Sequence, residues 1–359
     1  MRFVEAVQPR RARGRVAEVY AEVKRDFALL RDPDGNSPFL AHSPEPSLLE
    51  AFWSVLYETM LVDGRLRRPD KEAIAAAVSR ANACPFCVDA HSLLGGAAGE
   101  WSERGAIARG AGDALADQRR RELVEWAAST RDPASELVRR PPFGPEEAPE
   151  AIGTAVGFHY VNRVVTVFQG EAPMNLGPGP LRRPIARVVG AMAGRAVRRT
   201  HEPGRTLRSL PRREPPPDLD WAAPAPHVAG AFAALWAAAE AAGAEALDSP
   251  ARAAVDAALD RWDGDDPPLG GDWVNRALQG LEPASLPGAR LALLVALAPY
   301  RVDAVTVDRF RATRPGDDQL VSAVCWAAAR AARRVAGWLS TGDARAEAAT
   351  AGERVAARG

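Results

Sequence analysis

The chain has 359 residues, of which 47% are apolar and 26% are charged, and its 46 Lys and Arg balance its 46 Asp and Glu. This composition is typical of a globular protein with room for two domains. The zero net charge argues against a nucleic-acid partner, and no apolar run approaches the roughly 20 residues that span a bilayer. The charged N-terminus does not resemble a secretion signal, so the cytoplasm is the expected location.

Long segments rich in Ala, Leu, Val, Arg and Glu predict an all-α fold with very little β-strand. The stretch 152–168 contains several β-branched residues, but its apolar stripe and its length favour a helix. The candidate helices are 14–30, 46–62, 70–82, 85–98, 103–111, 117–130, 145–168, 185–199, 226–243, 249–262, 271–279, 287–297, 300–312 and 317–339.

A Pro-rich and Arg-rich stretch interrupts this helical pattern. Between residues 182 and 213 the chain has ten Arg and a single acid, Glu202. Two interpretations fit such a stretch: a surface that binds an acidic partner or lipid headgroups, and a connector that lies against acidic faces of its own protein. The balanced overall charge favours the connector. We therefore expect four parts: a domain at 1–170, a linker at 171–225, a second domain at 226–345, and a disordered tail at 346–359.

The two predicted domains resemble each other weakly. CPFCVDAH at 84–91 aligns with APYRVDAV at 298–305, so that Pro, Val, Asp and Ala coincide. Flanking helices also align, ELVEWAAS with SAVCWAAA and SLLEAFWSVLYETM with HVAGAFAALWAAAE. The second domain then reads as a degenerate copy, in which Ala298, Arg301 and Val305 replace both cysteines and the histidine.

The chain has only three Cys and five His, yet Cys84, Cys87 and His91 fall within eight residues. Their spacing places them on one face of a helix that begins near Pro85, so Cys84 lies near the N-cap, where the helix dipole favours a thiolate. His91 can exchange a proton with Cys87. Glu72, on the preceding helix, can orient water or thiol. A base beside a thiol is the usual way to activate sulfur.

A CxxC motif in a reducing compartment indicates redox or metal chemistry. Redox chemistry is favoured here, because a zinc site would call for a second CxxC or paired His, and an inactive vestigial site is the remaining alternative. No glycine-rich nucleotide motif is present, so no cofactor is expected. His159 is interpreted as a core histidine, Asn162 and Arg163 as structural, and Cys325 as a small buried hydrophobe.

The string Glu72-x11-Cys84-x2-Cys87-x3-His91, within SRANACPFCVDAHSLLG, resembles the signature of the alkylhydroperoxidase D-like branch of the carboxymuconolactone decarboxylase family. The resemblance covers about residues 40–170, including FHYVNRVVTVF. It implies an all-α bundle built from repeated units. Two fused copies would form an internal pseudo-dimer, so any homo-oligomer is expected to be smaller than those of single-copy relatives.

The resemblance also implies a thiol-dependent peroxidase. Cys87 would attack a hydroperoxide, Cys84 would close a disulfide, Glu72 and His91 would relay protons, and an external dithiol or thioredoxin-like partner would reduce the disulfide. The best-studied members have a histidine where this chain has Phe86. The helix dipole instead favours Cys84 as the more acidic thiol. The alternatives are a small-molecule-binding protein without redox activity and a lactone decarboxylase-type lyase, although the lyase branch generally lacks the CxxC motif.

Overall fold

The structure, a computed structural model, describes residues 1–27, 35–100, 102–170, 172–174 and 199–356, together with 188, 190 and 194. Every regular element in these ranges is helical, as the sequence predicts. The helices of the first half are α1 (Gly14–Asp26), α2 (Pro38–His42), α3 (Pro46–Leu56), α4 (Arg68–Ala81), α5 (Pro85–Gly95), α6 (Arg104–Arg109), α7 (Gln118–Ser129), α8 (Glu136–Arg139) and α9 (Ala148–Gln169).

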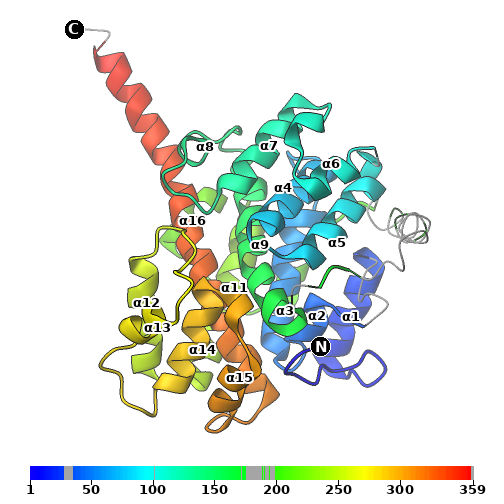
Figure 1. Ribbon diagram of the computed structural model, residues 1–359. Coiled ribbons are helices and arrows are strands. Elements are labelled where there is room, and N and C mark those ends of the chain that lie inside the picture. Colours follow the sequence, from blue (N-terminus) through cyan, green and yellow to red (C-terminus); the bar gives the residue numbers. More distant parts are fainter. Residues whose placement is uncertain are drawn as a thin grey trace.

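The second half continues in the same manner. Its helices are α11 (Pro226–Ala246), α12 (Ser249–Asp260), α13 (Asp272–Ala277), α14 (Leu286–Leu297), α15 (Ala304–Arg311) and α16 (Asp317–Ala356). Short π turns, η1 (Tyr57–Leu61) and η2 (Gly96–Glu100), extend α3 and α5, and 3-10 turns are η3 (Gly112–Ala114), η4 (Thr206–Ser209), η5 (Pro217–Ala222) and η6 (Pro299–Arg301). The last turns of α16 extend beyond the bundle (Figure 1).

Helix α9 lies at the centre of the molecule, with α4 on one side and α16 on another (Figure 1). Its residues from Ala148 to Phe168 are all buried, because apolar and small side chains occur around the whole circumference of the helix. It therefore packs on helices of both halves, including α14 and α11 of the second. The segment that sequence reasoning could mistake for a strand is thus a buried central helix.

Some predicted helices differ from the observed ones in their bounds, and the helix predicted at 317–339 extends as α16 to Ala356. The predicted helix 300–312 begins only at Ala304, since Pro299–Arg301 form a 3-10 turn and Asp303 caps α15 by accepting a hydrogen bond from the backbone N–H of Thr306. The helix predicted from residue 14 ends at Asp26. The predicted helix 185–199 lies almost entirely outside the described residues.

The described part of the linker packs on the protein. Thr206 is buried, and its backbone N–H and hydroxyl both donate to the Glu58 carboxylate. Arg205 pairs with Asp26 at 2.5 Å and lies over the ring of Tyr57. These contacts agree with a connector that lies against acidic groups of its own chain.

The central helix also touches equivalent ends of the two aligned helices. The Asn162 carbonyl oxygen accepts a hydrogen bond from Asn82 at the end of α4, and Arg163 donates to the backbone oxygen of Ala296 near the end of α14. Asn82 and Ala296 correspond in the sequence alignment. The four-part division of the chain stays a prediction. Helix α16 continues through the predicted tail to Ala356, and residues 357–359 lie outside the described residues.

Candidate active site

The two cysteines lie at the junction of α4 and α5. Helix α4 ends in a Schellman arrangement: Ala83 adopts a left-handed backbone (φ 50°), its N–H donates to Arg80 O, and the Cys84 N–H donates to Ser79 O at 2.8 Å. Pro85 then begins α5, which makes Cys84 its N-cap, as the sequence predicts. One turn later Cys87 follows on the same face.

Both thiols are free and buried, with exposed fractions of 2% for Cys84 and 3% for Cys87. Burial raises the pKa of the Cys87 thiol well above its usual range, and the hydrogen-bonded Cys84 sulfur raises it further. A polar interaction with the side chain of Asn162 lowers this pKa. Of the contacts described around Cys87, this is the one that favours its thiolate.

Glu72 and His91 form a buried pair next to the thiols in sequence. The Glu72 carboxylate accepts a hydrogen bond from His91 Nδ1 at 2.7 Å, and the neutral ring then carries its lone pair on Nε2. Phe158 meets the imidazole edge to face, with ring centroids 4.4 Å apart. The imidazole is thereby held in one orientation, with Nε2 as its proton-accepting atom.

Arg68 completes this group, although it is not among the site residues predicted from the sequence. Its Nε atom lies 2.6 Å from Glu72 one helical turn away, and the Glu72 carboxylate is fully buried. Burial by itself raises the pKa of Glu72, but the positive charge of Arg68 and the bonds from His91 and Arg68 outweigh burial and hold it below its usual value. Glu72 is thus an anion that orients His91.

The structure therefore brings Cys84 together with Cys87, and Glu72 together with His91. Among the described residues, no group of three or more His, Cys, Asp and Glu side chains has the arrangement of a metal site. Within the same ranges, no helix has both the length and the apolar character that crossing a bilayer requires. The aligned positions of the second half hold a buried Ala298, and Val305 is exposed.

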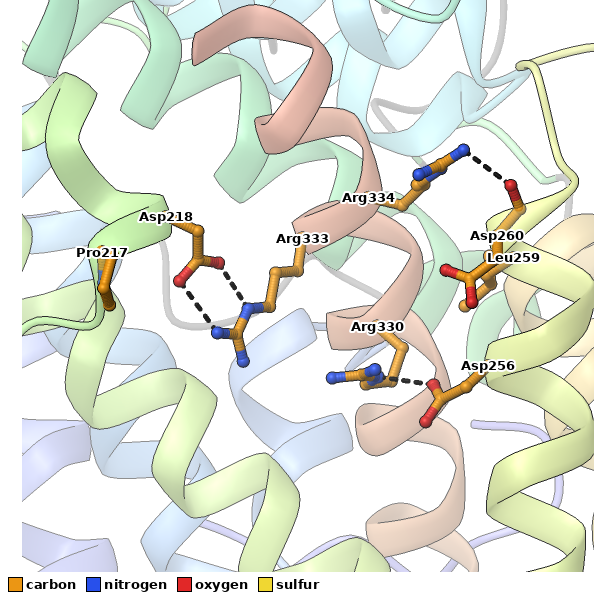
Figure 2. A pocket seen from close by; sticks show the side chains of 8 residues that line it. All are labelled: Pro217, Asp218, Asp256, Leu259, Asp260, Arg330, Arg333 and Arg334. Atoms are coloured by element: carbon orange, nitrogen blue, oxygen red, sulfur yellow. Dashed lines mark hydrogen bonds and ion pairs between the residues drawn. The ribbon is translucent and has the colours of Figure 1, made fainter. Parts of the chain in front are cut away.

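A charged pocket of about 470 Å³ lies away from these four residues, between α16, α12 and η5 (Figure 2). Arg333 makes two bonds to the Asp218 carboxylate, and Arg330 pairs with Asp256 at 2.7 Å. Arg334 donates to the backbone oxygen of Asp260. Its guanidinium groups already have protein partners, so we interpret the pocket as an ion-pair contact between helices. The side chains that line it are Pro217, Asp218, Asp256, Leu259, Asp260, Arg330, Arg333 and Arg334.

An all-helical bundle with two thiols at a helix start and a bonded Glu–His pair defines a class of protein, and the comparisons agree with it. The family model described as "Carboxymuconolactone decarboxylase family" matches residues 46–129, which include all four predicted site residues. The chain belongs to this family, in its alkylhydroperoxidase D-like branch. A particular relative is the alkyl hydroperoxide reductase Rv2159c of Mycobacterium tuberculosis, 41% identical over 343 residues that cover 94% of this chain and 96% of the relative.

Proposed function

We propose that this protein is a thiol-dependent hydroperoxidase, in which Cys84 and Cys87 are the reacting thiols and Glu72 and His91 move protons. The observation that carries the proposal is the pair of reduced, adjacent thiols at the start of the helix that also carries His91. The similarity to an alkyl hydroperoxide reductase over nearly the whole chain supports the same reaction type.

The proposed reaction has two steps, formation of a sulfenic acid on Cys87 and its condensation with Cys84. The Cys87 proton passes to His91 Nε2, and the thiolate attacks the terminal oxygen of a hydroperoxide. An S–O bond forms, the O–O bond breaks, and the departing alkoxide takes the proton from His91 as an alcohol. Cys84 then attacks the sulfur of the Cys87 sulfenic acid, so that a disulfide forms and the hydroxyl leaves as water.

Turnover requires two electrons from outside the chain. An external dithiol, or a thioredoxin-like partner, would reduce the Cys84–Cys87 disulfide by thiol–disulfide exchange through a mixed disulfide. The predicted cytoplasmic location is consistent with such a reductant. A homo-oligomer smaller than those of single-copy relatives stays a prediction.

Peroxide consumption with a dithiol reductant tests the proposal. We expect Cys87→Ser and Cys84→Ser to lose at least about 100-fold in turnover, and Cys325→Ser, which changes the third buried thiol, to stay within a few-fold of wild type. Mass spectrometry should find the Cys84–Cys87 disulfide in peroxide-treated wild type and a sulfenic acid on Cys87 in Cys84→Ser. Undiminished consumption by Cys87→Ser would contradict the mechanism, and no turnover by wild type would favour the non-redox alternatives.

A further inference from the structure

Each of the last four carbonyl groups of α4 accepts a hydrogen bond, and the donor to the final one is a side chain. The first three accept from backbone N–H groups of the residues that follow the helix, including Cys84. The carbonyl oxygen of Ala81 accepts from the guanidinium of Arg131, whose Nη1 lies 3.3 Å away. The final carbonyls of a helix have no partner within it, and the helix dipole favours a cation beside them. Arg131 therefore completes the end of the helix that leads into Cys84.

The residue before Cys84 has a backbone conformation that needs support from its surroundings. Ala83 has a φ of 50°, which is the left-handed region that a Cβ atom disfavours. Such a conformation persists only where the contacts around it hold it in place. Besides the backbone bonds to α4, these contacts are the Asn82 side chain, bonded to α9, and the bond from Arg131 to the last carbonyl of α4.

The second half of the chain holds the same guanidinium from the other side. Arg131 Nη2 donates to Gly264 O at 2.8 Å and to the Asp266 carboxylate at 2.7 Å, both in the loop between α12 and α13. The two segments lie very close together, because a Cβ atom on Gly264 would lie 1.6 Å from the backbone oxygen of Arg131. Gly264 also has a φ of 98°. The loop can therefore approach Arg131 in this way only with glycine at that position.

This loop is itself fixed against the central helix. Trp262 is buried, and its Nε1 donates to Asp265 O at 2.9 Å, which closes the loop on itself. Arg163 of α9 lies over the Trp262 ring, 5.6 Å from its centroid. The loop 262–266 thus has a defined conformation where it meets Arg131, so it can hold the guanidinium in place.

We propose that Arg131 is a positioning residue, through which the loop 262–266 of the second half holds the turn that carries Cys84. The inference rests on the proposed function, in which Cys84 and Cys87 form a disulfide. It gives the second half, which has neither cysteine nor histidine at the aligned positions, a part in the redox site.

The stability of the disulfide reports on this turn. A disulfide closes only when the two Cα atoms lie about 4.4–6.8 Å apart, so the backbone freedom of Cys84 affects the free energy of closure. A turn that is held in place loses little conformational entropy when the bond forms. A loosened turn gives the dithiol form more conformations and favours it.

The test is the thiol–disulfide equilibrium of the full chain in a series of reduced-to-oxidised glutathione ratios, read by mass spectrometry of the peptide that carries both cysteines. In Arg131→Met we expect the equilibrium constant to shift about five- to tenfold toward the dithiol, which is a potential about 20–30 mV less negative. Gly264→Ala changes only the second half. It should shift the equilibrium in the same direction, because the loop must withdraw from Arg131.

Each variant has a matched control. Gly280 also lies in the second half with a positive φ of 88°, but a Cβ atom there meets no atom within 4 Å, so Gly280→Ala adds the backbone strain without the clash. Arg119 lies at the opposite end of α7 and pairs with Glu147 at 2.6 Å, so Arg119→Met removes an arginine away from the cysteine turn. Neither control should move the equilibrium.

A wild-type equilibrium in Arg131→Met would overturn the inference even if its unfolding free energy falls, because Arg131 would then support stability alone. If Arg131→Met does not fold, the same result in Gly264→Ala overturns it. The measurement needs no peroxide, so a wild-type protein that forms the disulfide but consumes no peroxide would refute the proposed function and leave this test readable. A wild-type protein that forms no disulfide at any ratio would overturn both.

Discussion

Arg68 lies one helical turn before Glu72 and directs its Nε atom onto a fully buried carboxylate oxygen 2.6 Å away, while the other oxygen of that carboxylate accepts from His91. Glu72, which the sequence predicts as part of a proton relay, is therefore the middle of a three-membered group. A guanidinium that is itself mostly buried keeps the carboxylate ionised, and the carboxylate keeps the imidazole in one tautomer. Predictions about the site follow from this arrangement.

Replacing Glu72 by Gln should lower peroxide turnover about 10- to 100-fold, because the neutral amide no longer fixes the tautomer of His91 or stabilises its protonated form. The disulfide should still form, more slowly, when stoichiometric peroxide is added. Stopped-flow measurement of the loss of stoichiometric peroxide gives the rate of disulfide formation separately from steady-state turnover. Wild-type turnover in Glu72→Gln would show that the carboxylate has no part in the reaction.

Removing Arg68 should change how stability depends on pH. The folded-state pKa of Glu72 lies below its unfolded value of about 4.3, so this group stabilises the fold above that pH, and the contribution is lost as the pH falls through the folded pKa. In Arg68→Met the folded pKa rises, so the contribution is smaller and its loss begins at a higher pH. Overall stability should fall by about 2 kcal/mol near neutral pH.

Urea unfolding of Arg68→Met between acid and neutral pH measures this shift. Arg65→Met is the matched control, because the Arg65 side chain is mostly exposed and lies 3.8 Å from an equally exposed Glu146. It should change stability by less than about 0.5 kcal/mol at any of these pH values. If the unfolding free energies of wild type and Arg68→Met fall in parallel as the pH is lowered, the pKa of Glu72 does not depend on this arginine.

Gly64 should not tolerate a methyl group, because a Cβ atom would lie 2.2 Å from the Glu150 carboxylate. That carboxylate cannot easily move, since it accepts from the backbone N–H groups of Arg65 and Leu66 and pairs with the buried Lys71 at 2.6 Å. We expect Gly64→Ala to cost about 2–4 kcal/mol of unfolding free energy.

Gly144→Ala is the control for this prediction, because a Cβ at Gly144 meets no atom within 4 Å. Chemical denaturation of both variants gives the comparison. Equal stabilities of the two alanine variants would show that Glu150 is free to leave Lys71.

A fragment of residues 1–170 should fail to fold alone, although it contains every predicted site residue. In the whole chain α9 packs on α16 and α14, and Tyr160 of α9 interacts with Cys325 in the second half. Without residues 171–359 this surface, and the Arg163 guanidinium bonded to Ala296 O, would lose their partners. Circular dichroism and thermal unfolding of the fragment check the prediction, and a cooperative transition near that of the full chain would refute it.

Most of the fold is predictable from the sequence, because the patterns that indicate helices are local. Periodic apolar residues and Pro at helix starts place α4, α5 and α7, and α3 together with η1, within a few residues of their observed bounds. The error at Pro299 arose because a 3-10 turn and a capping Asp303 occupy a segment whose composition is also compatible with a helix. The end of α1 was placed too late for a similar reason, since composition alone does not mark where a helix stops.

The site was only partly accessible from sequence. Cys84, Cys87 and His91 lie within one stretch, and Arg68 was available in principle, since charged residues four apart on a helix commonly pair. Asn162 could not be linked to Cys87 from the sequence, because about 75 residues separate the two and only the packing of α9 against α4 brings them together. The interpretation of His159 as a satisfied core histidine is confirmed, as both ring nitrogens have partners.

Ser79 has a consequence for how this family can diverge. Its carbonyl oxygen accepts the backbone N–H of Cys84, and its hydroxyl accepts the N–H of Asn162 on α9. One residue thus ties the backbone at Cys84 to the central helix α9, so the position of this cysteine is set locally and not by distant helices. Substitutions in the outer helices can therefore accumulate while the start of α5 keeps its place, whereas a change at Ser79 itself would disturb both the start of α5 and its tie to α9.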